Sequence, residues 1–550
     1  KNRLASESYS ALAVPFNEGY WGMNVKEGEP YDLSFYARTE SRQTVTAQLE
    51  SADGKKTYAK VEVSNVSGSW KRYACKMKAD GTDPKARLTL CVSKPGTLWL
   101  DVVSLFPKTF KSRANGLRPD LVGLLQGLRP GFLRFPGGCV VEGVTLENRI
   151  QWKNTIGDIA RRPGRWGLWG YHNTEGLGFH EYLQMCEDLD TEAMYVVNAG
   201  LSCAPRNGEV VSDPEELKSY IQDTLDALEY ATGPVTSKWG AERVKNGRTP
   251  PFKIKYVEIG NENGGNDYFR NYRLFYDAIK AKHPGIITIA DCPIPNEPVE
   301  IIDEHHYVAP DWFFANEKKY DSYDRKGPRI YVGEYAVTGG VGTGNLLGAL
   351  SEASFMIGME RNSDVVVMAS YAPLFENVNN REWPVNLIRF DSARSAGRTS
   401  YHVQTMFSAH RPDVTLATAV EEIGKLAPKA GDAIGIGTWD TQAVKLKSPQ
   451  QKAGLYALGG KDEKTGQFII KAVNPGAAPL DTAFSIVGAS KLKPKAHVFT
   501  LAGDKPTDEN TLDEPAKVVP VESVFEGVGP EFKYSLKPYS LTIFRIDTAK

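Results

Sequence analysis

The sequence has no excess of charge of either sign and no long apolar run. Its 550 residues include 66 Lys and Arg against 67 Asp and Glu, which gives a formal net charge of −1. Such a balance provides no electrostatic reason to bind nucleic acid or an anionic membrane, so we expect neither partner. No run of about 18 apolar residues is present, so we expect no membrane-spanning helix.

Cysteine is scarce and widely spaced. The six cysteines are Cys75, Cys91, Cys139, Cys186, Cys203 and Cys292. No CxxC pair occurs, which argues against a zinc or dithiol motif. Cys75 and Cys91 lie in strand-like runs that could be neighbours, so the sequence allows a disulfide between them without requiring it.

Three common phosphate-binding or catalytic motifs are also missing. The glycine-rich stretch 339–349 follows a strand and opens a helix, but it contains neither GxxxxGK[ST] nor a clean GxGxxG. We interpret it as a flexible loop. No GxSxG motif is present, which argues against a serine hydrolase.

The first residues, "KNRLASESYS", have no signal-peptide pattern, so they do not indicate a compartment.

The length exceeds that of a single hydrophobic core, and the strand pattern changes twice along the chain. Residues 1–108 contain short alternating runs such as "YDLSFYAR" and "ARLTLCVS", which predict a β-sandwich. Residues 413–550 return to this pattern, with runs such as "AIGIGTWD" and "GQFIIKAVNP", and predict a second sandwich.

Between them, residues 109–412 alternate strand-like and helix-like runs, the pattern of parallel βα units. The predicted strands are "GFLRF", "AMYVVN", "IKYVEIG", "IITIAD", "IIDEHH", "IYVGE" and "VVVMAS". A closed (β/α)₈ barrel needs eight strands. We therefore predict a barrel whose first strand lies upstream of residue 1. The expected fold class is multidomain, α/β plus all-β, with a barrel between two β-sandwiches.

Two glutamates follow this pattern at the ends of apolar strands. Glu262 lies in "YVEIGNENGG" and Glu334 in "RIYVGEYAV". In a parallel barrel, residues just past the strands gather at one rim. Two carboxyl groups at such a rim can cleave a glycosidic bond, one as nucleophile and one as acid and then base. Asn261 precedes Glu262, and its amide can bond a sugar 2-hydroxyl. We expect the acid to have a raised pKa because Glu334 is negative beside it.

Further side chains at these strand ends are candidates for the site. His305 and Tyr307 share one face of their strand and are expected to point into the site and orient the nucleophile, while His306 points to the other face. Two adjacent histidines therefore do not make a metal site, and we expect no metal and no organic cofactor. Tyr335 could place its hydroxyl near Glu334, and Asn198 ends another strand.

The stretch "GFLRFPGGCVVEG" with "RIQWKNTIGDIARRPGRWGLWGYHNTEGLGFHEYLQMCEDL" resembles the α-L-arabinofuranosidases of glycoside hydrolase family 51, especially their plant-like branch. The resemblance continues through "YVEIGNENGG", "YVGEYAVTGG" and "NSDVVVMASYAPLFENV". It implies a retaining, exo-acting enzyme that releases arabinofuranosyl groups from arabinose-containing polysaccharides or oligosaccharides. It also implies that residues 1–108 resemble a carbohydrate-binding module.

The resemblance assigns roles to individual residues. Glu262 matches the acid/base, Glu334 the nucleophile, Asn261 the residue that contacts the 2-hydroxyl, Tyr307 a tyrosine near the nucleophile and Trp169 a tryptophan of the sugar pocket. Cys139 stands in "PGGC" where many bacterial members have an asparagine that touches the sugar, and the plant-like branch shares it. The family's first barrel strand carries an arabinose-binding glutamate for which this chain shows no counterpart.

Three points stay open at this stage. Another retaining barrel glycosidase, such as an endo-glucanase or xylanase, would have the same pair of glutamates, and a sugar-binding protein with an inactive barrel is a third alternative. The resemblance is consistent with a homo-oligomer. It is also consistent with a secreted, periplasmic or cell-surface location after signal removal.

Overall fold

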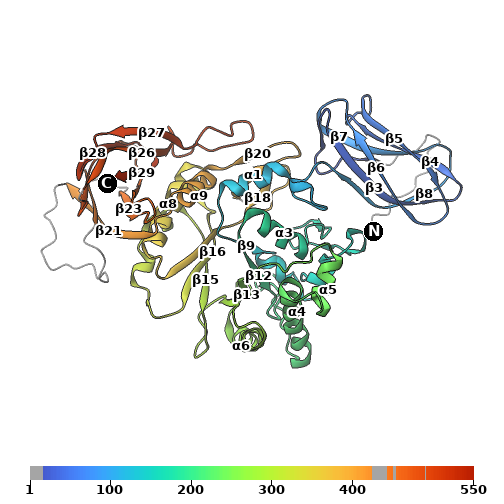
Figure 1. Ribbon diagram of the computed structural model, residues 1–550, viewed down its shortest axis with the longest axis horizontal. Helices are drawn as coiled ribbons and strands as arrows, with labels where there is room; N and C mark the ends of the chain where they lie inside the picture. The colour runs from blue at the N-terminus through green and yellow to red at the C-terminus, as the bar shows by residue number, and fades with distance from the viewer. Residues whose placement is uncertain (1–15, 384, 424–442, 450–453, 490, 550) are drawn as a thin grey trace. The chain divides into compact units, whose positions relative to one another are not determined.

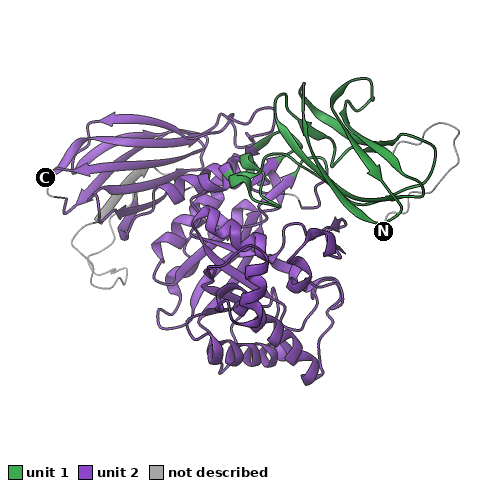
Figure 2. Cartoon of the chain, turned by 45° about the vertical axis from the view of Figure 1, so that its right-hand side comes forward, with its two compact units in different colours: residues 1–122, 377–379, 390–395 green, residues 123–376, 380–389, 396–550 purple. Residues whose placement is uncertain are grey.

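The computed structural model describes residues 16–383, 385–423, 443–449, 454–489 and 491–549 (Figure 1). The chain forms two compact units (Figure 2). Unit 1 comprises Lys1–Val122, Asn377–Asn379 and Phe390–Ser395, and unit 2 comprises Gly123–Glu376, Asn380–Arg389 and Ala396–Lys550.

Unit 1 contains the predicted N-terminal β-sandwich. One sheet has the order β1-β7-β4-β5 with β2 on β7, and the other has the order β6-β3-β8. The strands are β1 (Phe16–Asn17), β2 (Met23–Val25), β3 (Pro30–Thr39), β4 (Gln43–Glu50), β5 (Thr57–Val66), β6 (Lys71–Lys78), β7 (Asp83–Val92) and β8 (Leu98–Phe106). Alternate residues of β3 and β4, such as Leu33, Phe35, Val45 and Leu49, are buried between the sheets.

The allowed disulfide between Cys75 and Cys91 is not formed, because both are free thiols. Cys75 lies on β6 and Cys91 on β7, so the two strands belong to different sheets of the sandwich. The prediction that their strands could be neighbours was wrong for this reason.

Unit 2 contains the predicted barrel, whose seven described strands are all parallel, in the order β17-β16-β15-β14-β13-β12-β9. They are β9 (Phe132–Phe135), β12 (Glu192–Val197), β13 (Tyr256–Ile259), β14 (Ile287–Ala290), β15 (Ile301–Val308), β16 (Arg329–Val337) and β17 (Val366–Tyr371). Each coincides with a predicted strand. Among the described residues no strand joins β9 to β17, so this barrel sheet has two free edges.

The barrel sheet is curved around a common interior. One apolar cluster takes side chains from every one of its seven strands: Phe132, Met194, Tyr256, Ile287, Ile289, Ile301, Tyr331 and Met368. Phe132 on β9 packs edge-on against Tyr331 on β16, with ring centroids 5.5 Å apart. A flat sheet would keep these strands far apart, so the contact shows that the strands wrap toward closure.

Helices surround the barrel strands (Figure 1). They are α1 (Pro119–Gly127), α2 (Gly138–Glu142), α3 (Phe179–Leu189), α4 (Pro214–Thr232), α5 (Lys238–Lys245), α6 (Gly265–Lys282), α7 (Pro310–Ala315), α8 (Leu346–Arg361) and α9 (Thr399–Ala409). Helix α4 shows how the sequence sets a helix start. The Asp213 side chain accepts a hydrogen bond from the Glu215 amide at 2.9 Å, and Pro214 occupies the first turn.

Further short strands and single turns of 3-10 helix lie between residues 110 and 397. The strands are β10 (Arg165–Trp166), β11 (His172–Asn173), β18 (Phe375–Asn377), β19 (Ile388–Phe390) and β20 (Ser395–Gly397). The turns are η1 (Phe110–Ser112), η2 (Trp152–Thr155), η3 (Ile159–Arg161), η4 (Lys319–Ser322) and η5 (Gly340–Gly342).

The C-terminal part of unit 2 is a second β-sandwich. Its strands are β21 (Val414–Ile423), β22 (Ala443–Pro449), β23 (Tyr456–Lys461), β24 (Phe468–Asn474), β25 (Leu480–Val487), β26 (Leu492–Ala502), β27 (Val521–Glu526), β28 (Glu531–Leu536) and β29 (Ser540–Thr548). Strand β21 pairs with β23 near its start and with β22 further along, so it belongs to both layers. Phe484 of β25 packs on Phe544 of β29 at 5.2 Å, between the layers.

One predicted strand of this sandwich, "AIGIGTWD", lies outside the described residues. No helix in the described ranges of the chain has both the length and the apolar character needed to cross a membrane.

Candidate active site

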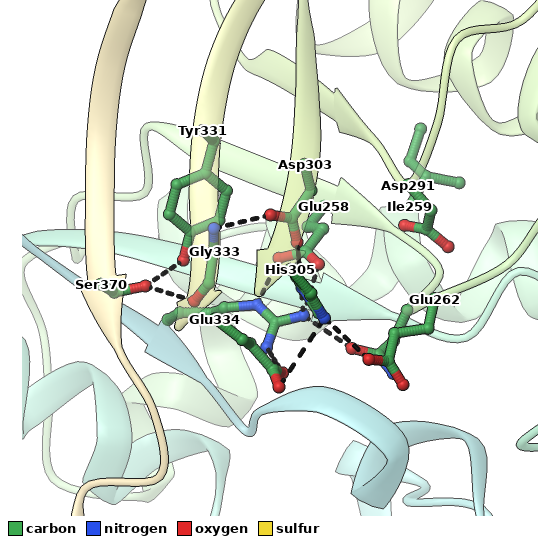
Figure 3. A network of polar contacts seen from close by, with 12 residues as sticks. Glu258, Ile259, Glu262, Asp291, Asp303, His305, Tyr331, Gly333, Glu334 and Ser370 are labelled. Atoms are coloured by element: carbon green, nitrogen blue, oxygen red, sulfur yellow. Dashed lines mark hydrogen bonds and ion pairs between the residues drawn. The ribbon is translucent and has the colours of Figure 1, made fainter. Parts of the chain in front are cut away.

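The site lies at the carboxyl ends of the barrel strands. Glu262 follows β13 directly, and Glu334 lies on β16. One oxygen of Glu262, one nitrogen of His305 and one oxygen of Glu334 all lie within 4.8 Å of one another (Figure 3). The separation agrees with the roughly 5 Å that retaining glycosidases need between their two carboxyl groups. Strand order therefore brings together two residues that are far apart in sequence.

Both oxygens of Glu334 are held by hydrogen-bond donors. Arg134 on β9 donates Nη1–H to Oε1 at 2.7 Å, and the Tyr307 hydroxyl donates to Oε2 at 2.6 Å. A Cβ on Gly138 would lie 2.7 Å from Oε1 of Glu334, so only glycine lets the "PGGC" loop approach this closely. The carboxylate is thus fixed in orientation before any ligand binds.

Arg134 has a second partner that the sequence reading missed. Its Nε and Nη2 form a bidentate pair with the two oxygens of Glu258 on β13, at 2.6 and 2.5 Å. Both side chains are nearly fully buried. Burial raises the pKa of Glu258 to about 7, against the opposing charge of Arg134. The sequence does contain a signal for this pair, namely a single charged residue within each of two apolar runs.

His305 lies between two carboxylates (Figure 3). Its Nε2 is 2.8 Å from Asp303 Oδ2, and its Nδ1 is 2.8 Å from Glu262 Oε1. Burial alone would lower the pKa of His305, but the charge and hydrogen bond of Asp303 outweigh it and raise this pKa well above 6.5. Of the two candidate catalytic carboxylates, Glu262 is the nearer to His305, since the distance from Nδ1 to Glu334 Oε2 is 3.7 Å.

This arrangement reverses one expectation. The sequence predicted a raised pKa for the acid, whereas the hydrogen bond from His305 lowers the pKa of Glu262 in the free protein. The physical reason is that the imidazole of His305, which the sequence reading placed beside the nucleophile, lies closer to Glu262 than to Glu334. Its hydrogen bond and charge lower the pKa of Glu262 by more than burial raises it.

The backbone around Glu262 is tightly constrained. Glu262 itself has a φ of 52°, in the left-handed region that costs a non-glycine residue about 1–2 kcal/mol. The next amide, that of Asn263, donates to Asp291 Oδ2 at 3.0 Å, which fixes the turn. A strained backbone of this kind persists only where the surrounding contacts hold it. Here it directs the Glu262 carboxylate toward His305 and Glu334.

Asn261 and Cys139 lie against this pair of glutamates. Asn261 is buried, and its Oδ1 accepts a hydrogen bond from Arg134 at 2.8 Å. Its Nδ2 lies 3.7 Å from Cys139 Sγ, and the same sulfur lies 3.7 Å from Glu262 Oε2. A thiol is a weak partner in both contacts, so either contact can be exchanged for one to a sugar hydroxyl.

A second thiol lies behind Cys139. Cys203, which is fully buried, receives Nη1–H of Arg206 at 2.9 Å. A hydrogen bond from Cys139, with the Arg206 guanidinium, lowers the pKa of Cys203 to about 6. Burial raises the pKa of the neighbouring Glu142 carboxyl to about 8. The sequence reading gave Cys203 and Glu142 no role.

Aromatic rings form one wall beside Tyr307. Trp383 packs edge-on against Tyr307 with ring centroids 5.1 Å apart, and Trp169 packs edge-on against Trp383 at 5.8 Å. The Arg206 guanidinium lies 4.7 Å from the centroid of Trp169. Trp383 comes from a loop with no periodic pattern, so the sequence offered no signal for it.

Three further side chains named from the sequence form their hydrogen bonds with groups other than the two carboxylates. The Tyr335 prediction was wrong, because strand alternation turns this side chain to the opposite face, where its hydroxyl accepts from Gln404 Nε2 at 2.7 Å. His306 also faces away, toward the Tyr320 hydroxyl at 3.3 Å. Asn198 is buried and bonded to backbone groups of its own turn, such as the Gly200 amide at 2.7 Å, so its contact with sugar stays a prediction.

Comparison with known protein families finds three models that match successive parts of the chain. The family model "Alpha-L-arabinofuranosidase 1 domain" matches residues 124–325, "Alpha-L-arabinofuranosidase C-terminal domain" matches residues 333–540, and "Carbohydrate binding domain" matches residues 19–97.

Whole-chain comparisons agree with these matches. Alpha-L-arabinofuranosidase 1 of Arabidopsis thaliana is 38% identical over 96% of this chain and 75% of its own length. The extracellular exo-alpha-L-arabinofuranosidase of Streptomyces chartreusis is 37% identical over 77% of this chain and 54% of its own length. An arabinose-bound family 51 enzyme, MgGH51, superposes with a TM-score of 0.86 at 29% identity, covering 97% of this chain and 85% of that one. The chain therefore belongs to the α-L-arabinofuranosidases of glycoside hydrolase family 51.

Proposed function

We propose that this chain removes terminal α-L-arabinofuranosyl groups by double displacement, with retention of anomeric configuration. The observation that carries the proposal is the approach of Glu262 and Glu334 to within 4.8 Å of each other, with His305 beside both. An inverting enzyme needs roughly 6.5–9.5 Å to admit a water molecule between its carboxyl groups, and this pair leaves no such room.

In the first step Glu334 attacks the anomeric carbon while Glu262 donates a proton to the leaving oxygen. Arg134 and Tyr307 hold the two oxygens of Glu334, so the attacking carboxylate needs little reorganisation. In the second step Glu262, now ionised, takes a proton from water, and the water attacks the same carbon and releases arabinose. No step requires a metal or organic cofactor.

The remaining pocket residues would bind the sugar. Asn261 Nδ2 is placed to donate to the 2-hydroxyl, since its Oδ1 is occupied by Arg134. Cys139 offers a small, polarisable contact beside Glu262. Trp169 and Trp383 offer flat apolar surface, which suits the C–H face of a furanose.

Relatives suggest the substrate class and location. MgGH51 binds arabinose, and the Streptomyces relative is named extracellular and exo-acting. We accordingly propose that the substrates are arabinose-bearing polysaccharides or oligosaccharides. We also propose that the enzyme acts outside the cytoplasm and forms a homo-oligomer. We further propose three domains, at residues 1–108, 109–412 and 413–550, of which the first matches a carbohydrate-binding family within residues 19–97.

A panel of nitrophenyl glycosides tests the activity. The α-L-arabinofuranoside should be hydrolysed with a kcat/KM well above those for the β-D-xyloside, the β-D-glucoside and the corresponding xylo- and cello-oligosaccharides. Preference for a glucan or xylan substrate would favour the alternative of an endo-acting glycosidase. Arabinose binding by calorimetry without turnover of any substrate would favour an inactive, sugar-binding barrel.

A further inference from the structure

A second polar cluster lies beside the two glutamates, and of its members only Cys139 has a place in the proposed sugar-binding site. Its members are Cys139 and Glu142 on α2 and Cys203 in the loop after β12. The two sulfurs and one carboxylate oxygen all lie within 4.8 Å of one another. Cys139 and Glu142 are three residues apart on one helical turn, so their side chains share a face. Cys203 approaches that face from another segment.

The distances suit a single metal ion. Zinc binds thiolate sulfur at about 2.3 Å and carboxylate oxygen at about 2.0–2.2 Å, so in a tetrahedral site two ligand atoms lie roughly 3.5–3.8 Å apart. The three atoms, which lie within 4.8 Å of one another, reach these distances by moving inward by up to about 1 Å. Two thiolates and one carboxylate are ligands that Zn²⁺ and Cd²⁺ favour over Mg²⁺ or Ca²⁺.

Charge and burial favour the same interpretation. Glu142 is 1% exposed and Cys203 is 0% exposed, and isolated negative charges are costly at such depth. A divalent cation with the Arg206 guanidinium would neutralise two thiolates and the Glu142 carboxylate.

Neighbouring residues already donate hydrogen bonds to two of the three candidate ligand side chains. Arg206 Nη1 donates to Cys203 Sγ at 2.9 Å, and Asn263 Nδ2 donates to Glu142 Oε1 at 2.7 Å. Hydrogen bonds of this kind to ligand atoms orient metal ligands in proteins and are compatible with a bound ion.

The geometry points to a binding site for a thiophilic divalent cation, Zn²⁺ or Cd²⁺, at Cys139, Glu142 and Cys203, through which the cation inhibits the adjacent glycosidase site. The inhibition rests on the proposed function. Cys139 Sγ lies 3.7 Å from Glu262 Oε2. A cation bound to this sulfur displaces its proton, removes the thiol donor from Glu262 and adds positive charge beside the residue that must donate a proton.

The test uses the full chain, kept reduced with a phosphine and freed of metal by a chelator. Isothermal titration with ZnCl₂ and with CdCl₂ measures binding, and the ultraviolet charge-transfer band of cadmium thiolates reports ligation by sulfur. We expect one ion per chain. Cys203→Ser and Glu142→Gln should each weaken binding at least tenfold, while Cys75→Ser, which removes a thiol on β6 of unit 1, should leave it unchanged.

Equal affinity in the native chain and in Cys203→Ser would overturn the inference. So would a disulfide between Cys139 and Cys203, found by counting thiols in the unfolded, unreduced protein, because the ligands would already be consumed. Arabinofuranosidase assays with added ZnCl₂ separate the two proposals. Hydrolysis with no cation binding contradicts the cation site alone, whereas cation binding without hydrolysis of any glycoside contradicts the proposed function and leaves the binding site standing.

Discussion

At the scale of single residues, the proposed role of Glu262 as an acid depends on the proton held by His305. The pKa of Glu262 is lowered in the free protein and that of His305 is raised, so at neutral pH the proton resides on the imidazole. The two groups are 2.8 Å apart and titrate as a pair. We interpret the pair as sharing one proton, which moves to Glu262 as the leaving oxygen develops negative charge.

The His305→Gln variant tests this sharing. In the native enzyme the alkaline limb of kcat/KM should follow loss of the proton held by His305, whose pKa lies well above 6.5. In His305→Gln that proton can reside only on Glu262, a carboxyl with an ordinary pKa of about 4.3, so the limb should move to lower pH by about one unit or more. A limb that moves to higher pH would contradict the shared proton, because it would mean that His305 only lowers the pKa of Glu262.

Alanine variants of the two glutamates should differ in their response to the leaving group. Glu334→Ala should lose roughly 10⁴-fold or more in kcat on every substrate, because no covalent intermediate can form. Glu262→Ala should lose about 10²–10⁴-fold in kcat/KM on alkyl or sugar leaving groups but far less on dinitrophenyl, which needs no proton. Equal losses on both kinds of leaving group would contradict the division of roles.

The sequence reveals some of these residues and hides others for physical reasons. The sequence points to Glu262 and Glu334 because each follows a short apolar run that predicts a strand, although β16 continues past Glu334 to Val337. Arg134 and Glu258 were overlooked because a single charge inside an apolar run leaves the strand prediction intact. The interaction of His305 with Glu262 depends on which strand ends are adjacent across the barrel, and no local pattern contains that information.

At the scale of elements, all seven predicted barrel strands are confirmed, because short apolar runs bounded by turns specify buried parallel strands. Side-chain direction was predicted less evenly. Alternation correctly separated His305 from His306, whereas Tyr335 was placed near Glu334 against the same rule, since adjacent residues of a strand face opposite sides. The lack of a strand between β9 and β17 in the described ranges agrees with the count of seven.

Helix α8 makes a polar contact that links three elements. Glu352, which is buried, accepts hydrogen bonds from the Val337 amide on β16 at 2.9 Å and from the Ser400 hydroxyl on α9 at 2.5 Å. Burial raises its pKa from 4.5 to about 7. Because the folded state holds this proton more tightly than the unfolded state, the contribution of Glu352 to stability is greatest below pH 4.5 and falls as the pH rises to 7.

The Glu352→Gln variant isolates this contribution. The native protein should lose about 3 kcal/mol of unfolding free energy from this group between pH 4 and pH 8, and the variant should lack that part of the slope. Urea unfolding of both proteins across this range measures the difference. Glutamine keeps an acceptor for the Val337 amide, so the two should be similar in stability at low pH. If the unfolding free energies of the two proteins changed with pH in parallel, Glu352 would have the same pKa in the folded and the unfolded state, which would contradict the prediction.

At the scale of the whole molecule, the barrel and the C-terminal sandwich share a compact unit. Lys471 on β24 is 1% exposed, and its Nζ lies 2.5 and 2.6 Å from the two oxygens of Glu360 on α8. A buried ion pair between the two regions makes the folding of one depend on the other. The sequence predicts a boundary near residue 412. It does not predict this ion pair, because in the sequence each partner is an ordinary charged residue of its own helix or strand.

Removing one partner should therefore destabilise both regions. Lys471→Met leaves Glu360 buried without its cation and should cost about 3–5 kcal/mol, while the double variant Lys471→Met with Glu360→Gln should recover most of that loss. Differential scanning calorimetry should show the barrel and the C-terminal sandwich unfolding in one transition in the native protein. Separate transitions for the two regions, with only one of them shifted by Lys471→Met, would contradict the coupling.

The central claim is that Glu334 forms a bond with the sugar while Glu262 transfers the proton. The most direct measurement incubates the enzyme with a 2-fluoro arabinofuranoside that carries a good leaving group, followed by peptide mass spectrometry. The account predicts one arabinosyl label per chain, on Glu334, and none in Glu334→Gln. A label on another residue, or hydrolysis that releases the inverted anomer with no label at all, would contradict it.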